Sequence, residues 1–367
     1  MIPVRNIYYL LCYAWNRLDE ADLLDVGSLP QNDLPNLLGR IMVAGTNRLL
    51  RQGVDRSYVS ASHDTQNPKG KIHVGRSVKR GLLLHNVVTC EVDELSPDVL
   101  HNRILKTTIH RLALTAGVAP ELAHELRLLE RQLSEISFIA IRAEHFARVQ
   151  LHRNNAFYRF LLHVCELCFF ALLADEGGAG YRFRDFVRDE ARMRKVFQDF
   201  IYNFYRLEQH VFSVSSERFG WDTTFTTDRA KALLPEMNTD VCLEAQARKI
   251  VIECKFTPHV LQEHWGKWSA RSEHLYQLFA YLKHLEQRGG VNAHSEGLLL
   301  YPTATEAVDL MFDTHGHSLR VVTVDLRKNW TDIKNQLLRL LAPWKQDIEL
   351  SGQILPACDA LRAHSQC

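Results

Sequence analysis

The chain has 367 residues, of which 46% are hydrophobic and 24% are charged, a composition typical of a soluble globular protein with room for two domains. Its formal net charge at pH 7 is only +1, so the sequence as a whole provides no electrostatic funnel toward a nucleic acid. This argues against a stand-alone enzyme that binds DNA tightly, because binding would need local patches or the help of a partner.

The first 150 residues are predicted to form a mixed α+β domain. An apolar segment at residues 2–15, which Asn6 can cap, predicts a buried helix, and it lacks the small-residue cleavage site of a signal peptide. Further helices are predicted at Leu34–Leu50, Asp98–Leu114 and Glu121–Leu133, and strands at Asp55–Ser62, Lys71–Val74 and Leu82–Asp93.

Residues 70–77, Gly-Lys-Ile-His-Val-Gly-Arg-Ser, nearly spell a phosphate-binding P-loop, with Arg76 where the lysine belongs. A polar loop precedes them instead of a strand, and no apolar strand that ends in Asp follows. We therefore interpret the segment as a strand between glycine turns, and we expect this chain to bind no nucleotide itself.

The eight cysteines are scattered along the chain. Cys12, Cys165, Cys168, Cys242 and Cys254 lie in apolar segments and are predicted to be small buried hydrophobic residues. Cys165 and Cys168 form a C-x2-C, but no second pair of cysteines lies at zinc-ribbon spacing, so we expect no metal or redox role. A reducing cytoplasm fits this usage best.

Residues 151–345 alternate helical and strand patterns, which predicts an α/β domain with a mixed central sheet flanked by helices. Helices are predicted at Phe157–Ala174, Glu190–Arg206, Ser272–Leu285 and Trp330–Leu341, and strands at Gly297–Tyr301 and Ser318–Val324. Residues 346–367 are predicted to form a frayed tail. The longest apolar helix is too short to cross a bilayer, and we expect no membrane role.

Residues 235–256 predict a β-hairpin around which the second domain is organised. Its second strand, Lys249–Phe256, is an apolar run rich in β-branched residues, which favours a strand buried on both faces. Glu253 and Lys255 are two residues apart on this strand, so both side chains point to the same face.

The register of this hairpin determines what meets on that face. With a turn centred on residues 246–247, Asp240 lies opposite Glu253, and Glu244 lies opposite Lys249. The turn contains no Gly or Asn to fix this register from sequence alone.

Two neighbouring carboxylates repel each other unless a cation lies between them, and oxygen ligands suit Mg²⁺ or Mn²⁺. Asp240 and Glu253 are therefore candidate metal ligands, and Lys255 is a candidate to hold the attacking water or to stabilise developing charge. This pattern resembles the PD-(D/E)xK nuclease superfamily, with Met237-Asn-Thr-Asp240 in place of Pro-Asp. A solvated charged strand is the alternative that these residues leave open.

A helical segment downstream strengthens the nuclease interpretation. Gln277 and Tyr281 are four residues apart in Ser272–Leu285, so they share one helix face. Gln-x-x-x-Tyr after Glu-x-Lys resembles the additional motif of RecB-like nucleases, where such a helix contacts the substrate strand beside the metal, so Gln277 and Tyr281 are candidates for DNA binding and active-site support. An ordinary half-buried helix is the alternative.

Other polar residues are weaker candidates. An acidic residue from the preceding helix could join the metal site, and Glu190 is such a candidate, although Gln198 has the more central position. His259 and His264 follow the hairpin, and residues 315–317 read His-Gly-His in a predicted turn. Loop histidines are mostly solvated, so we assign them no metal.

Several longer strings resemble the McrC family, the nuclease subunits of the McrBC modified-cytosine restriction systems. They are the opening Ile2–Trp15, Lys69–Ile72, Asp93–Leu95, Asn102–Lys106, Tyr181–Phe186, Leu234–Asp240, Ile252–Lys255, His274–Leu278 and Gly297–Pro302. The resemblance extends over about residues 2–341.

The resemblance implies a partner and a division of labour. A McrB-like hexameric AAA+ GTPase would recognise methylated DNA and translocate, while the N-terminal domain of this chain, residues 1–150, docks on that ring, inserts into its pore and stimulates GTP hydrolysis. The C-terminal domain would cut both strands of DNA, with Asp240, Glu253 and Lys255 as the catalytic set. Some relatives carry Asp at position 253, and either carboxylate can bind Mg²⁺.

Two alternatives stay open at this point. The chain could be a nuclease-inactive adaptor that activates a GTPase and holds DNA, which its intact acid–acid–lysine set argues against. It could also be an independent RecB-like nuclease that works with another partner.

Overall fold

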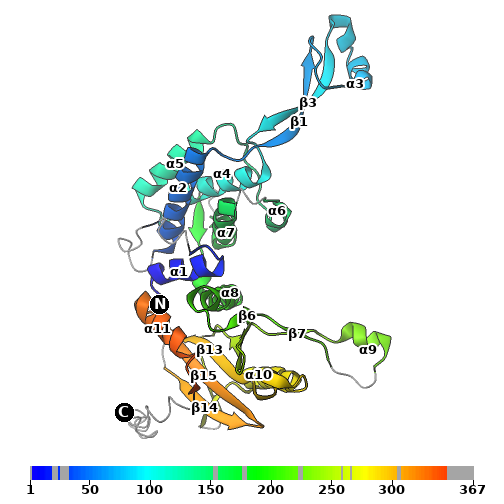
Figure 1. The fold of residues 1–367 in the computed structure, drawn as a ribbon. Coiled ribbons are helices and arrows are strands. Elements are labelled where there is room, and N and C mark those ends of the chain that lie inside the picture. Colours follow the sequence, from blue (N-terminus) through cyan, green and yellow to red (C-terminus); the bar gives the residue numbers. More distant parts are fainter. Residues whose placement is uncertain are drawn as a thin grey trace. The chain divides into compact units, whose positions relative to one another are not determined.

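The computed structural model describes residues 2–18, 24, 33–151, 156–175, 180–221, 226–257, 259–264, 267–303 and 307–344 (Figure 1). The predicted tail at 346–367 and the side chain of His264 lie outside the described residues.

The chain divides into two compact units. One unit, called here the helical unit, is Arg17–Arg192, and the other, called the sheet unit, combines Met1–Asn16 with Met193–Cys367. This division differs from the predicted boundary at residue 150. The N-terminus belongs to the sheet unit through helix α1 (Val4–Ala14), whose Tyr13 ring lies 5.7 Å from the Phe200 ring.

The helical unit is built mainly on four helices that pack through apolar faces. They are α2 (Leu34–Gln52), α4 (Leu100–Ala113), α5 (Pro120–Gln132) and α7 (Ala156–Ala171), with the short α6 (Ala143–Arg148) beside α7. Each of the four long helices buries several leucine or isoleucine side chains along one face. The predicted helix 157–174 ends earlier, because its last three residues form β4 (Leu172–Ala174), which pairs with β5 (Tyr181–Phe183).

A long antiparallel ribbon extends from these helices. It consists of β1 (Ser57–Thr65) and β3 (Val88–Ser96), and it carries α3 (Val74–Lys79) at its far end (Figure 1). The predicted strands here are partly wrong: β2 is only Lys71–Ile72, and Leu82–His85 is a 3-10 turn.

The near-P-loop segment is therefore divided between β2 and α3. The Ser77 hydroxyl donates to the His73 carbonyl (3.0 Å) and accepts from the Thr89 amide (2.9 Å), and these two bonds hold the first turn of α3 against β3. This local bonding explains why the predicted strand stops after two residues.

The sheet unit contains a six-stranded mixed sheet, which confirms the predicted fold class. The strand order is β14 (Asp309–Thr314), β15 (His317–Asp325), β13 (Glu296–Thr303), β10 (Lys249–Cys254), β9 (Val241–Glu244) and β6 (Ser213–Ser215). The central β13 runs parallel to both β10 and β15, whereas the other neighbours are antiparallel.

Helices and small ribbons complete this unit. Helix α10 (Ser272–Glu286) packs on β10 and β13, and α11 (Trp330–Arg339) packs on β15. Helix α8 (Glu190–Glu208) belongs to the unit from Met193 onward. The smaller elements are β7 (Arg218–Phe219), α9 (Asp228–Leu233), β8 (Met237–Asn238), β11 (Leu261–His264), β12 (Lys267–Ala270) and η6 (Gly290–His294).

Close contact between α10 and the sheet depends on Gly297 in β13. A Cβ atom there would lie 2.9 Å from Leu282 Cδ1 and 3.0 Å from Leu278 Cδ2, closer than ordinary carbon contacts. The absent side chain therefore sets how near α10 lies to β13, the neighbour of β10 in the sheet.

The predicted burial of five cysteines is confirmed, and Cys90 is buried as well. Burial raises the pKa of the Cys165 thiol to about 12, which is the behaviour of an inert hydrophobic residue. No helix in the described ranges has both the length and the hydropathy to span a bilayer.

Candidate active site

The β9–β10 hairpin has the predicted register. Lys249 pairs with Glu244 and Ile252 pairs with Val241, so the position opposite Glu253 is that of Asp240, one residue before β9 begins. Glu244 lies opposite Lys249 as predicted, and the two form an ion pair near the tip, with 2.9 Å between Lys249 Nζ and Glu244 Oε2. Burial alone does not select this register, because every residue of β10 is buried, and the Lys249–Glu244 ion pair instead holds the two strands in it.

Asp240 is anchored by the strand that it faces. Its Oδ2 accepts a 2.8 Å hydrogen bond from the backbone amide of Cys254, the residue between Glu253 and Lys255. Burial raises the pKa of Asp240, while this bond and the Lys255 charge act in the opposite direction. The carboxyl group is therefore held in place without an ion pair of its own within the described residues.

Glu253 is buried, with only 3% of its surface exposed, and its two carboxyl oxygens differ. Oε1 accepts a 2.7 Å hydrogen bond from Lys255 Nζ, whereas Oε2 has no hydrogen-bond partner among the described residues. Burial and the neighbouring charge of Asp240 raise the pKa of Glu253 to about 7. A buried carboxyl oxygen without a donor, next to a second carboxyl group, is a suitable place for a cation.

The donor set fits a hard divalent ion. Asp240 and Glu253 offer only oxygen, the ligand type that Mg²⁺ and Mn²⁺ prefer. Within the described ranges no cluster of three or more His, Cys, Asp or Glu side chains could hold a metal. Two carboxylates are the usual protein contribution to a Mg²⁺ site, which leaves the remaining positions to water and substrate oxygens.

The helix predicted to support the site contacts Lys255 directly. Lys255 Nζ donates to Gln277 Oε1 (2.7 Å), Gln277 Nε2 donates to the Tyr281 hydroxyl (2.7 Å), and this hydroxyl donates to the Asn238 carbonyl (2.9 Å). The chain of bonds orients both ends of the Gln277 amide. Tyr281 is buried, so this geometry fits support of Lys255 better than contact with DNA.

The pair His274 and Tyr301 was not predicted from the sequence. Tyr301 lies two residues after Leu299, the β13 partner of Glu253, and its hydroxyl is 2.8 Å from His274 Nδ1. Burial, followed by the Lys255 charge, lowers the pKa of His274 to about 4, so its ring is neutral at pH 7. Helical spacing was the sequence signal for His274, because this residue lies one turn before Gln277 and therefore on the same face of α10.

The other predicted candidates do not join this group. Glu190 belongs to the helical unit. Helix α8 approaches β10 near Asp199 instead, and the charge of Asp199, like burial, raises the pKa of Cys254. His259 is exposed, and His317 is buried with its Nδ1 2.8 Å from the Ser295 carbonyl.

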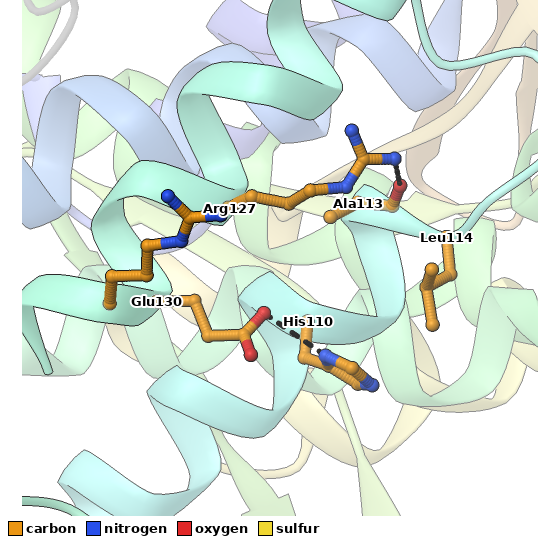
Figure 2. A pocket seen from close by; sticks show the side chains of 6 residues that line it. His110, Ala113, Leu114, Arg127 and Glu130 are labelled. Atoms are coloured by element: carbon orange, nitrogen blue, oxygen red, sulfur yellow. Dashed lines mark hydrogen bonds and ion pairs between the residues drawn. The ribbon is translucent and has the colours of Figure 1, made fainter. Parts of the chain in front are cut away.

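A pocket of about 210 Å³ lies in the helical unit, between α4 and α5 (Figure 2). It is lined by His110, Ala113, Leu114, Arg127, Glu130 and Arg131. Its charges are mixed: His110 Nδ1 is 3.0 Å from Glu130 Oε2, and Arg127 points to the Ala113 carbonyl at the C-terminal end of α4. The pocket therefore lacks the single-sign field that would select an anion or a cation.

Known proteins resemble this chain along most of its length. The family model of the McrBC 5-methylcytosine restriction system component matches residues 5–302. A relative from Escherichia coli (strain K12), the "Type IV methyl-directed restriction enzyme EcoKMcrBC", is 30% identical over 338 residues, which are 92% of this chain and 97% of that protein.

A solved structure shares the fold. It is a half-complex refined from a tetradecameric assembly of Thermococcus gammatolerans McrB AAA+ hexamers with bound McrC. The match has a TM-score of 0.56 at 17% identity and covers 92% of this chain and 75% of the other.

Proposed function

The chain belongs to the family of McrBC 5-methylcytosine restriction system components, and from this premise we propose that it is the DNA endonuclease subunit of a GTP-dependent system that cleaves methylcytosine-containing DNA. One observation carries the nuclease proposal. The buried Glu253 keeps one oxygen without a donor beside Asp240, while its other oxygen holds Lys255.

In this proposal Asp240 and Glu253 hold Mg²⁺, or Mn²⁺ in its place. A bound ion of this kind polarises a phosphodiester and lowers the pKa of a bound water. The protein contributes a fixed pair of carboxyl groups, because the Cys254 amide and the Lys255 ammonium each hold one of them.

Lys255 is proposed to act on the water or on the developing charge. An ammonium group has three N–H donors, and two of them are directed at Glu253 and Gln277. The third is left for an attacking water or for a non-bridging phosphate oxygen, where a positive charge stabilises the transition state.

We propose that a McrB-like AAA+ GTPase is the partner and that the helical unit docks on it. The Thermococcus gammatolerans structure contains McrC bound to such hexamers. In this chain the β1–β3 ribbon and its far end expose large apolar side chains, including Tyr58 (74% exposed) and Leu84 (87%). Exposed apolar patches of this kind mark interaction surfaces. The complex would work in the cytoplasm, with nucleotide bound by the partner alone.

The test uses the purified chain with and without a McrB-like subunit on a methylated plasmid with Mg²⁺ and GTP. Cleavage that needs both GTP and the partner is expected. Metal-dependent nicking by the chain alone would instead favour the independent nuclease. Stimulated GTP hydrolysis without any cut would favour the inactive adaptor.

A further inference from the structure

A duplex brings closely spaced negative charges to a site that already contains two carboxyl groups. The repulsion between the DNA phosphates and these carboxyl groups must be offset by positive charges close to the site, since the chain as a whole carries a net charge of only +1. Two arginines of the sheet unit, on different elements, are placed to do this: Arg194 on α8 and Arg271 just before α10.

Arg194 is positioned through its own helix. Phe197, one turn later, is buried with 1% of its surface exposed, and its ring lies 6.2 Å from the ring of Phe256, the residue that follows Lys255. Because residues three apart share a helix face, Arg194 lies on the side of α8 that approaches the end of β10.

The Arg194 guanidinium is exposed and makes no ion pair with any described residue. An exposed arginine on the face of α8 that approaches the end of β10 is available to bind an anionic ligand there.

Arg271 approaches from the other helix and is held in place. Its Nε donates to the His259 carbonyl at 3.0 Å, and its Nη1 lies 3.3 Å from Glu273 Oε1. It directly precedes the N-terminal turn of α10, whose backbone N–H groups also favour negative charge. This turn contains His274, and Gln277 follows one turn later against Lys255.

We propose that Arg194 and Arg271 bind the DNA backbone on the two sides of the phosphate that is cleaved. This inference rests on the proposed nuclease function and specifies how the same site holds its substrate. Arginine suits the role because its planar group donates two parallel hydrogen bonds to a phosphate. A purely structural role, in which the arginines only offset the buried carboxyl groups, predicts altered folding stability and unaltered DNA affinity.

The experiment measures binding of a fluorescent DNA duplex to the full chain between 50 and 200 mM NaCl with Mg²⁺, in a Lys255→Ala background that prevents turnover. Arg194→Ala and Arg271→Ala are each expected to weaken binding on the order of tenfold and to lower the slope of log K against log salt by about 1. The matched control is Arg206→Ala, which removes an exposed arginine from the same helix about three turns away and is expected to change neither quantity.

Several results would overturn the inference. These are no measurable binding by the background protein at 50 mM NaCl, equal slopes for Arg194→Ala and Arg206→Ala, or weaker binding with an unchanged slope. Since Arg271 also bonds to the His259 carbonyl, Arg271→Ala could unfold. Arg271→Lys then serves as the second variant, and it is expected to keep the salt slope while losing affinity severalfold. A slope lowered by about 1 in Arg271→Lys would count against the inference.

Failure of this inference and failure of the proposed function are distinguishable. If the wild-type complex cuts DNA and both alanine variants keep its KM, only the phosphate contacts are wrong. If the chain binds DNA with the expected slopes but never cuts, the nuclease proposal is wrong and the contacts stand.

Discussion

Gln277 Oε1 accepts a 2.7 Å hydrogen bond from Lys255 Nζ, the same length as the bond from this ammonium to Glu253. Lys255 is thus held from two elements, its own strand β10 and the helix α10. The position of α10 on the sheet therefore determines where the third ammonium donor points.

Asp240→Ala and Lys255→Ala are each expected to abolish DNA cleavage and to leave stimulation of the partner's GTPase unchanged. Both residues belong to the sheet unit, whereas the proposed docking surface belongs to the helical unit. Plasmid cleavage and GTP hydrolysis are measured on the same complexes. Loss of both activities in a folded variant would contradict the proposed division of labour.

Gln277→Ala is expected to lower kcat about 10- to 100-fold with little change in KM, because it frees Lys255 without removing it. Tyr281→Phe removes only the outer bonds of the chain and is expected to cost a few-fold. Tyr276→Phe is the matched control, since this tyrosine lies on the same helix and is 72% exposed. Equal kcat values for Gln277→Ala and the control would refute the positioning role.

Gly297→Ala is expected to destabilise the protein by about 1–3 kcal/mol, because the new methyl group would press on Leu278 and Leu282. The displaced α10 would also weaken the contact between Gln277 and Lys255, so cleavage should fall together with stability. Gly220→Ala is the control, because a Cβ there meets no atom within 4 Å. Chemical denaturation and cleavage assays measure the two effects, and a Gly297→Ala protein as stable as the control would exclude the close contact.

Glu253→Gln is expected to stabilise the metal-free protein at pH 8 and not at pH 5. Burial and the Asp240 charge raise the pKa of Glu253 to about 7, so the folded state holds a proton that the unfolded state releases near pH 4.5. Stability is therefore lost as pH rises between these values, by on the order of 1–3 kcal/mol, and a neutral amide avoids this loss.

Added Mg²⁺ is expected to make the wild-type protein more stable than Glu253→Gln at pH 8, because the ion binds the wild-type carboxyl pair and stabilises the folded state. Thermal unfolding at both pH values, with Mg²⁺ and with a chelator, gives the four comparisons needed. A stability difference that is the same at pH 5 and pH 8 would contradict a raised pKa for Glu253.

The geometry around Asp240 and Glu253 was predictable because it depends on short-range rules. Side chains two residues apart on an extended strand share a face, which places Glu253 beside Lys255, and the assumed turn at residues 246–247 places Asp240 opposite Glu253, as the structure has it. Spacing of four residues likewise places Gln277 and Tyr281 together. The catalytic roles of these residues stay predictions until they are measured.

Features that depend on distant contacts were not predictable. Helix α1 joins the sheet unit because the Tyr9 ring stacks 5.0 Å from the ring of Trp330, a residue more than 300 positions away. No local pattern contains that information, and the same is true of Arg194, whose relation to Glu253 depends on how α8 packs. Local bonding also overrode the strand pattern after Ile72, where α3 forms instead.

The hydrogen bond from the Cys254 amide to Asp240 has a consequence for control. Both acidic groups and the lysine are held within the sheet unit, by the hairpin and by α10, so none of them waits for another subunit to bring it into position. A motor that governs such an enzyme would have to act by feeding or withholding the duplex, and the timing of cutting would then be decided by where translocation stalls.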